Sequence, residues 1–221
     1  MSVPRGIRLS DDLPLFSFDV NRSLPPDWRD SVSSCLAVAG RHTRFDGHSN
    51  TSRERCFPRA RQASATVVDG AGIRSSMPWL LDLYEGLFLG LANSLGLGGF
   101  EAANGQRSAV NVNRLDVGER YEWHVDSNPL TGVLLLSTHV GSGGGALVFR
   151  PDPFEGTAQS WEVRVTPSQG TLLLFDARRS AHTVEPVVSG PPRISAPMNF
   201  YVSGAEQQRP DDLDAYLYEY E

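Results

Sequence analysis

The sequence predicts a mainly β fold, either a sandwich or a jelly roll, preceded by supporting helices. From residue 108 to residue 204, eight short runs of strand-forming residues follow one another, separated by clusters of Gly, Pro, Asp and Ser. The first half shows helical patterns and irregular stretches instead. The chain has 221 residues, a length that suits one domain with a substantial core.

Two helices are predicted within residues 1–107, which we interpret as helical and irregular support for the strands. The first covers residues 25–40, where Pro-Pro and Asp precede an apolar stretch that a Gly closes. The second covers residues 77–95 and is apolar on most sides, so we expect it to pack against a sheet. Its apolar residues recur at helical spacing: Leu80, Tyr84, Leu87, Phe88, Leu91 and Leu95.

Residues 41–62 contain six arginines, two histidines and few apolar side chains. We interpret this segment as a long loop. It is either a solvated surface or a lid whose arginines bind an anionic group of the substrate. The tail, residues 205–221, is acidic and is expected to be peripheral.

Charge and hydropathy exclude several classes of partner. The net charge of −6 argues against a nucleic-acid ligand, because binding to phosphates depends on Lys and Arg. Every long apolar stretch is interrupted by charged residues or glycines, so we expect no membrane span. The N-terminus lacks the apolar core of a signal peptide, and we expect a cytoplasmic protein. Cys35 and Cys56 show no metal-binding spacing, and whether they pair is left open.

The stretch YEWHVDSN, residues 121–128, places His124 two residues before Asp126 in a predicted strand. Side chains at that spacing lie on one face. His182, which opens a later strand after an arginine-rich turn, is the candidate for a third ligand. Two imidazoles and one carboxylate with neighbouring positions open are typical of non-haem Fe(II) oxygenases. The alternative is that His124 and Asp126 form a surface pair and His182 caps a strand.

Arg193 begins the final strand, and Ser195 follows on the same face. A guanidinium matches a carboxylate with two parallel hydrogen bonds. We therefore expect Arg193 to hold one end of a small dicarboxylic acid whose other end chelates the metal. His139 is expected to be structural. The glycines in residues 141–145 precede a strand, which indicates a turn and argues against a phosphate-binding loop.

The order His124-x-Asp126, His182, Arg193 resembles the signature of the Fe(II)/2-oxoglutarate-dependent dioxygenases. Tyr121, three residues before His124, stands where their prolyl-4-hydroxylase-like branch has a tyrosine that contacts 2-oxoglutarate. The apolar stretch at residues 132–140 and the segment at residues 170–187, which includes His182, are similar to that branch as well. The resemblance covers residues 108–204.

This resemblance implies a double-stranded β-helix, or jelly roll, with its catalytic core in residues 108–204. It implies the cofactors Fe(II), 2-oxoglutarate and O2, the release of succinate and CO2, and hydroxylation of a substrate C–H bond. It also implies two sets of site residues: His124, Asp126 and His182 for the metal, and Arg193, Tyr121, Ser195 and Asn113 for the co-substrate.

We therefore expect an enzyme that hydroxylates a small molecule, such as a free amino acid or a natural-product intermediate. Its compact size favours a small substrate, and prolyl hydroxylases usually have Lys where this chain has Arg193. The retained carboxylate of Asp126 favours hydroxylation over halogenation. Asn111, Trp123 and Asn128 are the candidates for the substrate side. The alternatives are the same chemistry on a peptide or protein residue, and a jelly-roll module that binds a metal or ligand without turnover.

Overall fold

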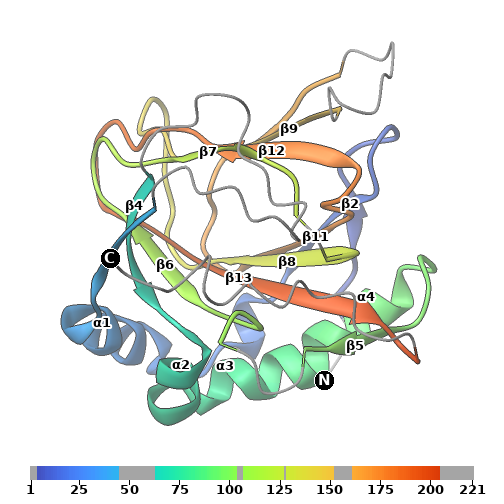
Figure 1. The fold of residues 1–221 in the computed structure, drawn as a ribbon, viewed down its shortest axis with the longest axis horizontal. Coiled ribbons are helices and arrows are strands. Elements are labelled where there is room, and N and C mark those ends of the chain that lie inside the picture. The colour runs from blue at the N-terminus through green and yellow to red at the C-terminus, as the bar shows by residue number, and fades with distance from the viewer. Residues whose placement is uncertain (1–3, 45–62, 104–106, 127, 152–160, 205–221) are drawn as a thin grey trace.

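The fold has three layers: a small sheet, a large sheet and a layer of helices on the outer face of the large sheet (Figure 1). The computed structural model describes residues 4–44, 63–103, 107–126, 128–151 and 161–204. All strand pairs are antiparallel, and the two sheets pack face to face. This architecture confirms the predicted mainly β jelly roll with supporting helices.

The large sheet has the order β1-β2-β11-β8-β13-β6-β4-β3, with β5 also paired to β13. The small sheet has the order β10-β9-β12-β7. Each of the eight strands predicted after residue 108 is present. The strands are β1 Ile7–Arg8, β2 Leu15–Asp19, β3 Arg41–Arg44, β4 Ala63–Val68, β5 Phe100–Ala102, β6 Val112–Leu115, β7 Tyr121–His124, β8 Leu130–Leu135, β9 Leu147–Pro151, β10 Val163–Val165, β11 Thr171–Phe175, β12 Ser180–Val184 and β13 Arg193–Val202.

Both predicted helices are present. α1 (Trp28–Val38) lies within the first predicted range. The second range contains α3 (Pro78–Leu83), a π-helical turn η2 (Tyr84–Phe88) and α4 (Leu89–Ser94), which follow one another without a break. Two shorter elements accompany them: the 3-10 helix η1 (Asn21–Ser23) and α2 (Gly70–Ser76).

The first half of the chain contains strands as well as the expected helices and irregular segments. β2 pairs with β11, and β4 pairs with β6, so both are part of the large sheet. Their partners lie far along the chain, and no local pattern marks such long-range pairing. The first four residues of the predicted loop form β3. The rest of that loop, residues 45–62 including Cys56, and the acidic tail lie outside the described residues.

The large sheet is buried on both faces because helices cover one side and the small sheet covers the other. Successive side chains of a strand point to opposite faces. In β11, Leu172 and Leu174 therefore pack in the cluster beneath the helices, whereas Leu173 and Phe175 pack between the sheets. Strands covered on both sides consist of continuous apolar runs, which explains the composition of β8 and β11.

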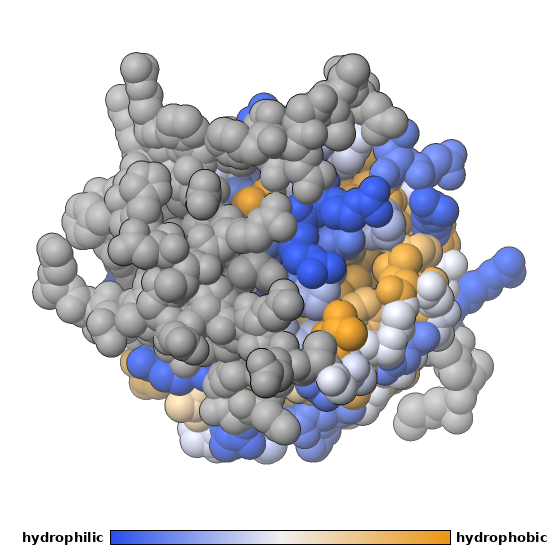
Figure 2. All heavy atoms as spheres, turned by 45° about the vertical axis from the view of Figure 1, so that its right-hand side comes forward, coloured by the Kyte–Doolittle hydropathy of each residue, from blue (hydrophilic) through white to orange (hydrophobic). Residues whose placement is uncertain are grey.

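The described surface is mixed in character. On the face in Figure 2, apolar groups are small and separated by hydrophilic residues. The exposed large apolar side chains come from several separate elements, among them Val38, Val140 and Val188. Within the described residues, no helix combines the length and apolar character needed to cross a bilayer. The expected cytoplasmic location stays a prediction.

Tyr84 joins the helical layer to the large sheet. Its side chain is fully buried, its hydroxyl donates a hydrogen bond to the Asn199 carbonyl, and it accepts one from the Ala103 amide at 2.6 Å. Burial raises the pKa of this phenol, so the hydroxyl keeps its proton and remains a donor.

We expect Tyr84→Phe to lower the free energy of unfolding by about 1–3 kcal/mol, because the Ala103 amide and the Asn199 carbonyl would lose a buried partner. Denaturant titration monitored by circular dichroism measures this, with an unchanged m-value showing that the two-state comparison holds. A loss too small to detect would mean that the hydroxyl does not join the two layers.

Candidate active site

A cavity of about 120 Å³ lies between the two sheets. A water molecule needs roughly 10–15 Å³ of such space, so the cavity has room for several non-hydrogen atoms. Ten of its fifteen lining residues are polar or charged, so its wall is richer in polar side chains than a typical small-molecule site. The lining residues include Asn111, Asn113, Tyr121, His124, Asp126, Thr131, Phe175, His182, Arg193, Ser195 and Asn199.

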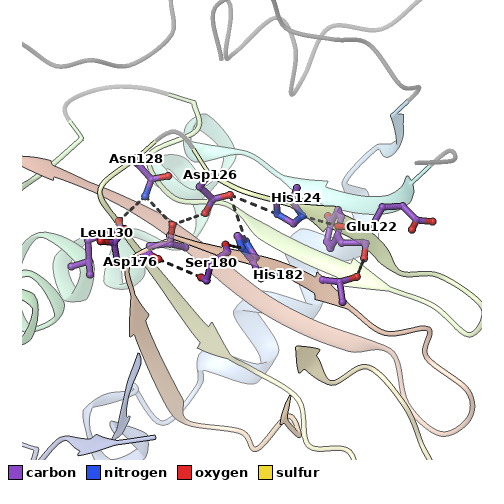
Figure 3. Close-up of polar contacts among 11 residues, drawn as sticks. Glu122, His124, Asp126, Asn128, Leu130, Asp176, Ser180 and His182 are labelled. Carbon is purple, nitrogen blue, oxygen red and sulfur yellow. Dashed lines mark hydrogen bonds and ion pairs between the residues drawn. The ribbon is translucent and has the colours of Figure 1, made fainter. Parts of the chain in front are cut away.

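The pairing of β7 with β12 brings the two candidate histidines together. His182 lies directly opposite His124 in the antiparallel register, and the centres of their rings are 4.1 Å apart. Asp126 lies just beyond the end of β7, and its Oδ1 is 3.6 Å from the Nε2 atom of each histidine (Figure 3). Two nitrogens and one oxygen therefore converge within 4.8 Å of one another.

Backbone carbonyls orient both rings. Nδ1 of His124 lies 2.7 Å from the Glu122 carbonyl oxygen, and Nδ1 of His182 lies 3.4 Å from that of Ser180. A carbonyl only accepts, so each Nδ1 is the donor, and each Nε2 faces Asp126. This is the usual arrangement of metal-binding histidines, whose second nitrogen is held by an acceptor.

Asp126 is held by its backbone and by its side chain. Its amide donates to the Ala177 carbonyl at 3.2 Å, which joins the ligand loop to the turn after β11. Its Oδ2 accepts a 2.6 Å hydrogen bond from the Thr131 hydroxyl. The other oxygen, Oδ1, remains directed at the histidines. The donor set of two imidazoles and one carboxylate suits Fe(II) with further positions left open.

Arg193 lies in the same cavity and is 1% exposed. Its Nε donates to the Gly145 carbonyl at 2.8 Å, and its Nη1 donates to the Ser195 hydroxyl at 2.7 Å. Burial lowers the pKa of the guanidinium to about 10, with Tyr121 opposing part of the shift. The group is therefore a cation at neutral pH. No carboxylate of the described residues forms an ion pair with it.

The glycine-rich turn between β8 and β9 shapes the pocket around this guanidinium. Gly144 and Gly145 have φ of +75° and +72°, where L side chains are strained. A Cβ on Gly144 would lie 2.1 Å from the Pro186 carbonyl oxygen, and a Cβ on Gly145 would lie 3.2 Å from Arg193 Cδ. The glycines therefore form a closely packed turn that supports Arg193, and a strand follows them as expected.

The structure places most of the predicted site residues at this cavity. Tyr121, Asn111, Asn113 and Ser195 line it together with the three candidate metal ligands and Arg193. Trp123 and Asn128 are not among the lining residues. The ring of Trp123 lies 3.9 Å beneath the Arg150 guanidinium, and the amide of Asn128 is buried behind Asp126. His139 is buried outside the cavity.

Seven lining residues were not predicted from the sequence: Thr131, Val133, Leu147, Phe175, Val184, Pro197 and Asn199. Phe175 contacts the His182 ring edge-on, with 5.3 Å between centroids. Thr131 and Asn199 are polar residues inside otherwise apolar strands. Asn199 also lies on the same face of β13 as Arg193 and Ser195, because it follows them by six and four residues. That spacing was the available signal.

Residues 110–201 match the family model described as "2OG-Fe(II) oxygenase superfamily". These residues are therefore similar to the 2OG-Fe(II) oxygenases. The matched region contains every element that supplies the cavity with its candidate ligands and with Arg193. Enzymes of this family use Fe(II), 2-oxoglutarate and O2, which confirms the cofactors expected from the sequence. No curated protein is detectably similar in sequence.

Solved structures with the same fold cover nearly the whole chain. The "non-heme alpha ketoglutarate dependent carbocyclase SnoK from nogalamycin biosynthesis" has a TM-score of 0.63 at 14% identity, with 97% of this chain and 89% of that chain covered. A 2OG-Fe(II) oxygenase from Burkholderia pseudomallei has a TM-score of 0.58 at 14% identity, with 88% of each chain covered. AviO1 from Streptomyces viridochromogenes Tue57 has a TM-score of 0.56 at 17% identity, with 92% of this chain and 90% of that chain covered. These likenesses establish the fold.

We expect Gly145→Ala to weaken 2-oxoglutarate binding about 5–30-fold, because strain of about 1–2 kcal/mol would displace the turn and the guanidinium beside it. Titration of the Fe(II) protein with 2-oxoglutarate without O2 measures this. Gly190→Ala is the matched control. Gly190 has φ +89° but no atom within 4 Å of its added Cβ, so its substitution should leave the titration unchanged. Equal effects of both substitutions would contradict a specific role of the turn.

Proposed function

We propose that the protein hydroxylates an unactivated C–H bond of a small molecule, such as a free amino acid or a natural-product intermediate, with release of succinate and CO2. In this proposal His124, Asp126 and His182 hold Fe(II). The observation that carries the proposal is a buried guanidinium in the same cavity as this triad, with no carboxylate partner among the described residues.

The residues present fit the metal. Three ligand atoms from two adjacent segments converge, each ligand has a second hydrogen bond that orients it, and the cavity lies on their open side. When bound, the iron supplies the activation of O2 that hydroxylation requires. The protein side chains supply its position and leave room beside it for the co-substrate.

The cavity also fits a dicarboxylic co-substrate. A buried cation without a counter-charge is costly, and a bound carboxylate would offset this cost through charge-assisted bonds. The Gly145 carbonyl and the Ser195 hydroxyl accept hydrogen bonds from Nε and Nη1 of Arg193, and these two bonds fix the plane of the guanidinium. Tyr121 and Asn113 line the same cavity and are the candidates for further contacts with 2-oxoglutarate.

Two amides are the best candidates for the substrate side, namely Asn111 and Asn199. The Asn199 amide nitrogen donates to the Ser108 carbonyl at 2.7 Å. Because a carbonyl only accepts, this bond identifies the amide atom facing Ser108 as Nδ2. The Oδ1 atom of Asn199 is then the candidate acceptor for a substrate. SnoK, which shares the fold at similar length, is by its title an enzyme of nogalamycin biosynthesis. This precedent supports a small-molecule substrate.

We expect the Fe(II) protein with 2-oxoglutarate, kept free of O2, to show the weak visible absorption band of a metal-bound keto acid, and we expect His182→Ala to abolish it. His139→Ala is the control, because His139 is also buried but has no hydrogen-bond partner for either ring nitrogen among the described residues. Succinate release is then screened with free amino acids, small metabolites and peptides. A response to peptides alone would overturn the small-molecule proposal, and an unchanged band in His182→Ala would overturn the triad.

Arg193→Met removes the charge while keeping an apolar side chain of similar length. We expect about a 10–100-fold weaker affinity for 2-oxoglutarate, because charge-assisted hydrogen bonds are each worth about 1.5–3 kcal/mol. Affinity for Fe(II) should persist, and the fold should survive, since replacing a buried charge with an apolar group is often tolerated. Arg164→Ala, on the exposed edge strand β10, is the control. Unaltered 2-oxoglutarate affinity in Arg193→Met would remove Arg193 from the co-substrate site.

A further inference from the structure

A short chain of buried polar side chains lies behind Asp126. Thr131, in the apolar strand β8, is 4% exposed, and its hydroxyl donates to Asp126 Oδ2 at 2.6 Å. Asn128 is 1% exposed, and its amide nitrogen donates to Thr131 Oγ1 at 2.8 Å and to the Leu130 carbonyl at 2.6 Å (Figure 3). Buried polar groups inside an apolar strand are costly unless they are satisfied, and these are.

The direction of every bond in this chain is fixed. The Leu130 carbonyl accepts only, so the group of Asn128 that faces it is the NH2 group. The same NH2 group donates to Thr131, which leaves the single hydroxyl proton of Thr131 for Asp126. Thr131 therefore acts as a donor to the carboxylate and cannot reverse its role while Asn128 is in place.

We propose that Asn128 and Thr131 are positioning residues that make Asp126 present one oxygen, and only one, to the metal. Oδ2 is occupied by the short bond from Thr131, while Oδ1 is equidistant, at 3.6 Å, from both histidine Nε2 atoms. Turning the carboxylate to offer both oxygens would break the bond to Thr131. Single-oxygen binding leaves one more metal position for the co-substrate and O2. This inference rests on the proposed function.

The hydrogen-bonded pair Asn128 and Thr131, which we call the relay, orients the Asp126 carboxylate, as backbone carbonyls orient the two histidine rings. Both imidazoles are oriented by backbone carbonyls, of Glu122 and Ser180. Asp126 follows the end of β7, where the strand no longer constrains it, and two side chains take over the task. A purely structural role for Asn128, as a turn residue bonded to Leu130, would not require the hydroxyl of Thr131 at all.

The test compares Thr131→Val with Thr131→Ser. Valine keeps the shape of threonine and removes the hydroxyl, whereas serine keeps the hydroxyl and removes the methyl group. We expect Thr131→Val to weaken Fe(II) affinity about 10–100-fold, as loss of a bond that orients a metal ligand typically does, and Thr131→Ser to restore it. Equilibrium dialysis of Fe(II) without O2 measures the affinity without turnover, and thermal unfolding monitors the fold. Thr138→Val is the control, because its hydroxyl bonds the Gln169 amide in an exposed loop.

Each outcome bears on the relay separately from the proposed function. Wild-type affinity for Fe(II) in Thr131→Val would overturn the relay while leaving the oxygenase intact. A loss in Thr131→Ser as large as that in Thr131→Val would show that keeping the hydroxyl does not preserve the affinity, which also overturns it. Absence of Fe(II) binding by the wild-type protein would instead overturn the proposed iron site itself.

Discussion

The register between β7 and β12 is the constraint on which the site depends. It sets His182 directly opposite His124. Because successive side chains of a strand alternate in direction, a slip of one residue would turn one imidazole to the outer face of the small sheet. The register of this pair shifts between His182 and Val184. The position of Asp126 follows, since its amide bonds to the Ala177 carbonyl just before β12.

The site also depends on a buried cation, the guanidinium of Arg193. Arg193 lies at the start of β13 with its side chain buried, and it donates hydrogen bonds to the Gly145 carbonyl and to the Ser195 hydroxyl. The charge stays in a region from which water is largely excluded, and this raises the strength of any interaction with an anion. The cavity is thus asymmetric, with metal ligands from the small sheet on one side and a positive group from the large sheet on the other.

Much of this could be predicted from the sequence because the relevant signals are local. The strands after residue 108 alternate with turn residues, and His124 and Asp126 are only two residues apart. Strands β2 and β4 could not be predicted with the same means, since Leu15 pairs with Phe175 far along the chain. Asn128 is a sequence-based candidate for the substrate side, but it is not among the residues that line the cavity. Its burial behind Asp126 depends on how the loop turns, which no pattern encodes.

The last strand, β13, has two faces with different tasks. Ala196, Met198 and Phe200 pack beneath the helices, whereas Arg193, Ser195 and Asn199 line the cavity. Alternate residues of one ten-residue strand therefore contribute to the cavity wall and to the packed core. Laboratory evolution toward a new substrate has a natural route at Asn199, because this residue faces the cavity while its neighbours Met198 and Phe200 pack in the core.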